Sequence, residues 1–113
     1  DNPVRVNDPI RYTIRVVNDT DVADGQVDIQ FPLPDGVKLE RVVPVTNPEL
    51  GNAEIKNGAV LLPYVPVLGP GDSIEYSVVL SSNQPQTFDM EVKVRSENQP
   101  EGYVDSVTTT VVQ

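Results

Sequence analysis

The chain has 113 residues, of which 17 are acidic and 8 are basic, so its formal net charge is −9. Nucleic acids and anionic membranes bind proteins through clusters of lysine and arginine, so this charge argues against nucleic acid as a partner. The chain contains no His and no Cys, which excludes disulfides, most zinc sites, and Ser-His or Cys-His catalysis. It also lacks a run of about 18 apolar residues, and we therefore expect no membrane insertion.

The length predicts a single domain over residues 1–113. Because the chain begins at Asp1 and not at Met, we expect it to be one repeat of a longer multidomain protein. Its first partners would then be the neighbouring domains of the same chain.

Apolar and polar residues alternate with a period of two along most of the chain, which predicts strands with one face on a core and the other in water. The main strands are predicted at residues 3–6, 10–17, 25–31, 37–43, 73–81, 87–95 and 104–112. The inward positions are clearest at Ile10, Tyr12, Ile14 and Val16; at Val27, Ile29 and Phe31; at Ile74, Tyr76, Val78 and Leu80; and at Phe88, Met90, Val92 and Val94. Short strands with Gly and Pro turns favour an all-β fold, an immunoglobulin-like β-sandwich with about seven main antiparallel strands and Greek-key connections. With an odd number of strands, the termini are expected at opposite ends of the sandwich.

The loop at residues 18–25 contains three aspartates, Asp19, Asp21 and Asp24. As an EF-hand loop that starts at Asp19, it lacks the glycine at position 6 and the glutamate at position 12. We favour a turn, because Asp and Asn side chains bond to their own backbone. The alternative is a weak calcium site, in which acids near the loop at residues 97–104 would join these aspartates. The same loop contains Asn18-Asp19-Thr20, which matches the glycosylation acceptor N-x-[ST] and is interpreted as a coincidence.

Two turns lie on either side of a small hairpin. Pro34, Asp35 and Gly36 end the third strand and lead into the fourth, and Gly36 is expected to have a positive φ. Pro70 and Gly71 fit a type II turn, because proline sets φ at the second position and glycine accepts a positive φ at the third.

The small hairpin is predicted at residues 53–62. Asn57 and Gly58 fit the centre of a type I′ turn, where both residues need a positive φ. This turn pairs Ile55 with Val60 and Ala53 with Leu62, so that both pairs share one face of the hairpin.

The order and spacing of these motifs resemble the conserved immunoglobulin-like repeat of bacterial and archaeal surface proteins, a family catalogued as a domain of unknown function, the eleventh of that series. The matching positions are Asp8, Ile10, Tyr12, Thr13, Ile14, Val16 and Asn18; Leu33 to Val37; Gly58 and Val60; and Leu68, Pro70, Gly71 and Ser73. The resemblance covers nearly the whole chain, but the last strand and the acidic loop before it depart from the family pattern. It implies an extracellular, cell-surface or cell-envelope module without catalytic activity.

A fibronectin type III domain is the second candidate fold. Those domains carry a tyrosine six residues after the leucine of an L-x-P-G turn. Here Ile74 holds that position relative to Leu68, and Tyr76 follows two residues later.

The leading hypothesis for function is therefore a non-catalytic structural, adhesion or spacer repeat. The alternative is a module that binds a protein or glycan through the loops at residues 18–25 and 97–104. Sugars stack on exposed aromatic rings, and only Tyr64 and Tyr103 lie near loops. No cofactor is expected beyond the calcium alternative.

Overall fold

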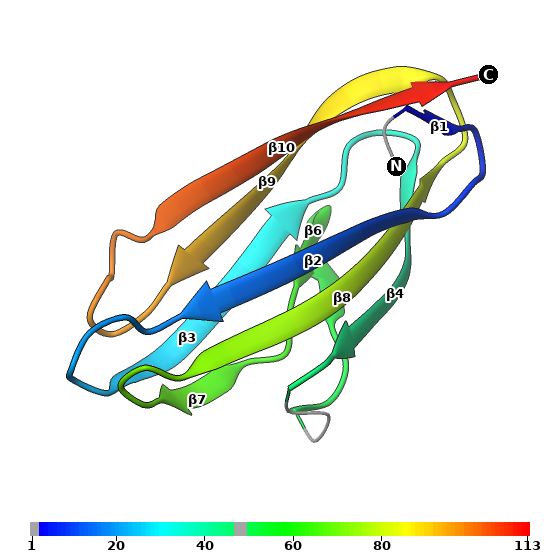
Figure 1. Ribbon diagram of the computed structural model, residues 1–113. Helices are drawn as coiled ribbons and strands as arrows, with labels where there is room; N and C mark the ends of the chain where they lie inside the picture. The colour runs from blue at the N-terminus through cyan, green and yellow to red at the C-terminus, as the bar shows by residue number, and fades with distance from the viewer. Residues whose placement is uncertain (1–2, 47–49) are drawn as a thin grey trace.

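The computed structural model describes residues 3–46 and 50–113, and these residues form ten strands (Figure 1). The strands are β1 (Val4–Arg5), β2 (Ile10–Val17), β3 (Asp24–Pro32), β4 (Val37–Pro44), β5 (Glu54–Lys56), β6 (Ala59–Leu61), β7 (Val65–Leu68), β8 (Ser73–Ser82), β9 (Gln86–Arg95) and β10 (Tyr103–Val112). Each predicted main strand is found, with ends that differ by at most one residue.

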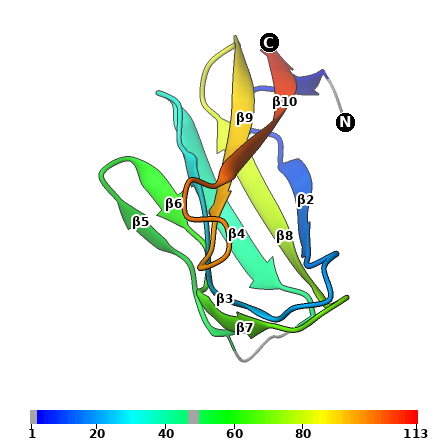
Figure 2. The same cartoon turned by 90° about the vertical axis from the view of Figure 1, so that its left-hand side faces the viewer.

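The strands form two sheets that pack face to face as a sandwich (Figure 2). The larger sheet has the order β1-β10-β9-β3-β6-β5, and β7 also pairs with β3. The smaller sheet has three strands in the order β2-β8-β4. The molecule is elongated, at 47 × 26 × 26 Å. The prediction of an all-β sandwich is confirmed.

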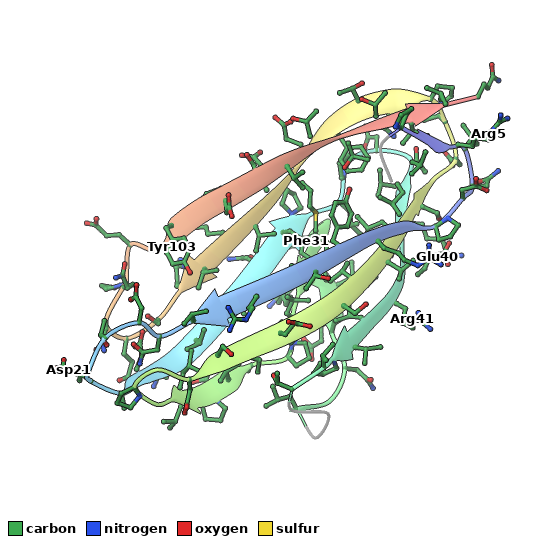
Figure 3. The ribbon with its side chains drawn as sticks, viewed as in Figure 1. Arg5, Asp21, Phe31, Glu40, Arg41 and Tyr103 are labelled. Carbon is green, nitrogen blue, oxygen red and sulfur yellow. The ribbon has the colours of Figure 1, made fainter. Side chains whose placement is uncertain are left out.

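The core follows the predicted alternation. Of the predicted inward positions, Tyr12 and Val92 are half-buried, and all the others belong to the buried core. The largest fully buried side chains are Tyr76 from the smaller sheet and Phe31 from the larger one. Figure 3 shows Phe31 between the two sheets. Apolar burial of this kind is the main driving force for folding.

The predicted turns are present. Gly36 has a φ of 80°, and the Val37 amide donates to the Pro34 carbonyl at 3.0 Å. Gly71 has a φ of 72°, and the turn it belongs to closes through a hydrogen bond from the Asp72 amide to the Gly69 carbonyl at 3.0 Å.

The small hairpin also has the predicted turn. Asn57 and Gly58 have φ values of 53° and 76°, as a type I′ turn requires. Ile55 pairs with Val60 as expected. The ladder ends between Glu54 and Leu61, so the predicted pair of Ala53 with Leu62 lies just outside it.

One strand was not predicted. β7 pairs antiparallel with the start of β3, from Asp24 opposite Leu68 to Val27 opposite Val65. Its four residues include Pro66, which has no amide hydrogen to donate, and its exposure does not alternate. A strand this short with a central proline carries no period-two signal.

The prediction of termini at opposite ends is wrong. β1 runs parallel to the end of β10, with Val4 opposite Val111, so the first and last strands lie side by side at one end of the sandwich (Figure 1). The odd-number argument assumes that every strand spans the long axis. β1 has only two residues and does not span it.

Candidate binding site

Three loops meet at the end of the sandwich away from β1, which we call the distal end: residues 18–23, 69–72 and 96–102. The first two loops are joined through their backbones. The Asn18 amide donates to the Asp72 carbonyl at 2.9 Å, and the Gly71 amide donates to the Asn18 carbonyl at 2.8 Å. The opposite, proximal end carries the β1–β10 pair and the turn at Gly36.

The Asn18 side chain organises the first loop from within. It is 8% exposed, and its amide nitrogen donates to the carbonyls of Val22 and Leu68 at 2.8 and 3.0 Å. Its side-chain oxygen accepts bonds from the amide and the hydroxyl of Thr20. Both amide hydrogens are therefore used inside the fold. This supports the interpretation of the glycosylation motif as a coincidence and of the loop as a turn.

Asp24 joins the loops at residues 18–25 and 97–104, which the sequence analysis paired only as an alternative. One carboxylate oxygen accepts bonds from the amides of Gly25 and Asn98 at 2.8 and 3.0 Å, and the other accepts a bond from the Ser96 hydroxyl. Partial burial by itself would raise the pKa of the Asp24 carboxyl, but these bonds outweigh it and hold that pKa below its usual value. The side-chain amide of Asn98 also donates to the Ala23 carbonyl at 3.2 Å.

A cleft of about 230 Å³ opens between the joined loops. Asn18, Asp19 and Thr20 line one wall, and Ser96, Asn98 and Gln99 line the other. Tyr103, at the start of β10, lies on its rim and is about half exposed. Burial and the negative charges of Asp105 and Asp19 raise the pKa of the Tyr103 hydroxyl, so the rim is a neutral phenol beside carboxylates.

The geometry of these loops bears on the calcium hypothesis mainly at Asp24. The carboxylate of Asp24 already accepts three hydrogen bonds, and Asp21 lies at the outer tip of its loop (Figure 3). Within residues 3–46 and 50–113, no three acidic side chains are grouped closely enough to hold a metal ion. Calcium binding by Asp19, Asp21 and Asp24 stays a prediction. An NMR titration checks it: binding at about 5 mM calcium would move the amide signals of residues 19–25.

The two aromatic candidates for sugar stacking do not share a site. Tyr103 lines the distal cleft, whereas Tyr64 lines a shallow hollow with Gln26, Arg95 and Pro100. Each ring is about half exposed, but each stands alone in its hollow. A sugar ring would thus meet one aromatic side chain at either place.

A second opening was not predicted. A groove of about 350 Å³ lies between β2 and β10, with β9 as its floor. It shares Val16, Val94 and Tyr103 with the distal cleft, so the two hollows are continuous. The sequence carried one signal for it: Asp105 occupies an inward position of β10, where a covered face would have an apolar residue.

No family model matches the chain, and no curated protein matches it. Among solved structures, the chain is similar to a non-cellulosomal cohesin from the hyperthermophilic archaeon Archaeoglobus fulgidus, with a TM-score of 0.61 and 11% identity over 99% of this chain and 85% of that one. It is also similar to a part of a family 123 glycoside hydrolase from Clostridium perfringens, with a TM-score of 0.58 and 9% identity. That match covers 99% of this chain but only 22% of the hydrolase.

These likenesses define the class of the protein as an all-β sandwich. At identities of 9–11% they show the fold and carry no activity across to this chain. Within the described part of the chain, no helix is long and apolar enough to cross a membrane.

Proposed function

We propose that this domain is a non-catalytic binding module of a secreted or cell-surface protein, which acts in adhesion or assembly through its distal end. The observation that carries the proposal is the junction at Asp24. It fixes two loops, far apart in sequence, into one cleft at the end away from the β1–β10 pair. Loops held by a rigid sandwich are the usual location of binding residues in such folds.

The arrangement of the first and last strands favours binding over spacing. Since β1 and the end of β10 lie together at the proximal end, a chain that continued from both would hold the sandwich to one side. Its distal loops would then point away from the attachment. A spacer that transmits length along its long axis needs the opposite arrangement.

A protein is the favoured ligand, and a glycan is the second candidate. The cleft carries one aromatic rim residue, Tyr103, beside two carboxylates, Asp19 and Asp24, and uncharged polar residues. Sugar sites depend on stacking, whereas protein interfaces combine a few aromatic anchors with a polar rim. The resemblance of the sequence to repeats of bacterial and archaeal surface proteins supports the same class of function and the extracellular location.

The test is a binding screen with the whole domain attached through its proximal end. Purified surface proteins and a glycan array serve as probes. We expect Asp24→Ala, which removes two of the hydrogen bonds that join the loops, to weaken the binding of any ligand found by at least about tenfold. Asp35→Ala, in the turn at the proximal end, is the matched control and should bind as the wild type does. Equal binding by both variants would refute the distal site.

A further inference from the structure

We propose that the groove between β2 and β10 binds an extended segment of a partner protein, which adds as a fourth strand to the smaller sheet beside β2. The inference rests on the proposed function and specifies its partner and docking mode. It uses a surface next to the distal cleft, so the two can be tested apart.

The inner face of β10 changes from covered to open along the strand. Thr109 and Val111 face the core and are 4% and 3% exposed. Further toward the distal end, Tyr103 and Val107 are 48% and 51% exposed. They lie on the same inner face, as their register with β9 shows: Tyr103 is opposite Val94, Asp105 opposite Val92 and Val107 opposite Met90. No strand of the smaller sheet covers this part of β10.

The edge that would receive the missing strand is available. β2 pairs only with β8, so its other edge carries backbone groups without a strand partner in the described part of the chain. Such an edge is a template for an added strand. A hydrogen bond between the hydroxyls of Tyr12 and Thr109, at 2.5 Å, closes the groove on the proximal side. From Tyr12 to Val16 the groove accommodates about five extended residues, or roughly 17 Å.

The groove wall specifies the inward side chains of the partner. Val107 on β10 and the half-buried Val92 on β9 expose apolar surface to the groove. Ile14, Val16 and Met90 also line the groove but are almost fully buried. Asp105 interrupts that surface with one negative charge. A matching segment therefore has apolar residues at most inward positions and one lysine or arginine opposite Asp105.

The outer face of β2 specifies the other side of the partner. Arg11 and Arg15 alternate with the inward residues of β2, and neither makes an ion pair with the described residues. Arg15 lies opposite Glu75 of β8, whereas Arg11 lies opposite an uncharged residue, Val79. Opposite charges on neighbouring strands stabilise a sheet. The outward side chains of the added strand are thus acidic.

The same charges argue against a second copy of this chain at the edge. If two β2 strands paired antiparallel about Thr13, Arg11 of each copy would lie opposite Arg15 of the other. Like charges directly opposite each other destabilise a sheet. Each copy also carries a formal net charge of −9, which repels the other.

Asp105 gives the groove its selectivity. An inward-pointing charge near a sheet edge prevents indiscriminate strand pairing, because an apolar strand would bury it without a partner. A segment with a cation at the right position neutralises it. The same residue, Asp105, would therefore both discourage indiscriminate pairing at this edge and recognise the correct partner.

The probe is a labelled synthetic peptide of about nine residues with valines inward, one central lysine inward and glutamates outward. Its binding to the whole domain is measured by fluorescence anisotropy. Two control peptides have the lysine replaced by glutamate or the centre replaced by proline, which cannot complete the ladder. We expect both controls to bind at least about tenfold more weakly, and Asp105→Lys to reverse the preference between lysine and glutamate.

Two variants of β10 separate the groove from the rest of the strand. Val107→Asp changes the inner face and should weaken the lysine peptide at least about tenfold, whereas Val104→Asp changes the outer face at a similar exposure and should not. Melting temperatures confirm that both variants fold. No peptide binding, equal loss in both variants, or a dimer or glycan complex that Val107→Asp abolishes would overturn the inference. A distal ligand that Val107→Asp leaves bound, with no peptide binding, would refute the groove and leave the proposed function standing.

Discussion

The middle of the sandwich and its edge between β2 and β10 are built from the same alternating sequence pattern but differ in how well they are covered. On the central strands β3 and β8, inward residues such as Phe31 and Tyr76 are fully buried. At the β2–β10 edge, which we call the open side, Tyr103 and Val107 at inward positions of β10 are about half exposed. The difference shows that alternation determines which face a side chain takes. Whether that face is covered depends on how many strands the opposite sheet supplies.

The largest expected effect tests this contrast with two aromatic truncations. Phe31→Ala removes a side chain that is 1% exposed and should lower the free energy of unfolding by about 3–5 kcal/mol. Tyr103→Ala, at an inward position of the open side, should lower it by less than about 1 kcal/mol. Urea denaturation of both variants measures the difference. Similar losses of unfolding free energy would show that the open side is as well packed as the covered middle of the sandwich.

Two glycines with positive φ compare the ends of the molecule. Gly36→Val, at the proximal turn, should cost about 1–2 kcal/mol through backbone strain, since the nearest atoms to a new Cβ are flexible ends of Asn83 and Gln84. Gly102→Val should lower the free energy of unfolding by more, because its new Cβ would clash with the Val94 carbonyl oxygen. Backbone atoms cannot move aside as easily as the end of a flexible side chain. Thermal melts rank the two. An unchanged melting temperature for Gly36→Val would contradict the turn assignment.

Two tyrosines form hydrogen bonds across the sandwich, Tyr76 in its covered middle and Tyr12 on the open side. The Tyr76 hydroxyl donates to the Pro63 carbonyl at 2.7 Å in the buried core, and Tyr12 bonds to Thr109 beside the groove. Tyr76→Phe leaves a buried carbonyl without its donor and should cost about 1–3 kcal/mol, and Tyr12→Phe should cost less. Chemical denaturation measures both losses. Equal losses in the free energy of unfolding would contradict the difference between the covered middle and the open side.

The Tyr76 link also predicts a pH dependence. Burial raises the pKa of the Tyr76 hydroxyl to about 12, above its value in the unfolded chain. The unfolded state therefore releases this proton first, and stability falls as the pH rises from about 10 to 12. The loss between these pH values should be smaller in Tyr76→Phe.

The sequence predicted the parts of the fold that depend on local chemistry. The pairs Asp35-Gly36, Asn57-Gly58 and Pro70-Gly71 predicted the three turns, because a positive φ depends on the identity of only one or two residues. The inward faces of the strands followed from alternation for the same reason. β7 was not predicted, and the termini were wrongly predicted at opposite ends, since both features depend on which distant strand each segment pairs with.

The site was predicted only in part, for a related reason. The loops at residues 18–25 and 97–104 were chosen for their acids and exposed position, and the structure does bring them together at Asp24. Asp24 itself was considered as a metal ligand, whereas its carboxylate accepts hydrogen bonds from the other loop. The groove was not predicted because it exists only where the smaller sheet has no strand to cover the inward face of β10. A single strand pattern does not report what lies opposite it.

The smallest expected effect concerns Asp24, which joins the loops beside the open side. Its native pKa is lower than in the unfolded chain, so its contribution to stability is complete above the usual aspartate pKa of about 3.9 and is lost as the pH falls through the native value. Asp24→Asn should therefore be less stable than the wild type by about 1 kcal/mol at neutral pH, and by almost nothing near pH 2.

Asp28→Asn, on the same strand, is the control for that measurement. Asp28 forms an ion pair with Arg95 at 3.7 Å, but both side chains are exposed, and surface pairs of this kind contribute about 0–1 kcal/mol. High salt should screen the Asp28 pair more than the Asp24 junction, because the Asp24 carboxylate accepts direct hydrogen bonds from two backbone amides and a hydroxyl, whereas the Asp28 pair is an exposed ion pair at 3.7 Å. If the stability gap of Asp24→Asn did not change with pH, the junction would owe nothing to the ionised carboxylate, and the two loops would be held by other bonds, such as the one from the Glu97 amide to the Gly25 carbonyl at 2.9 Å.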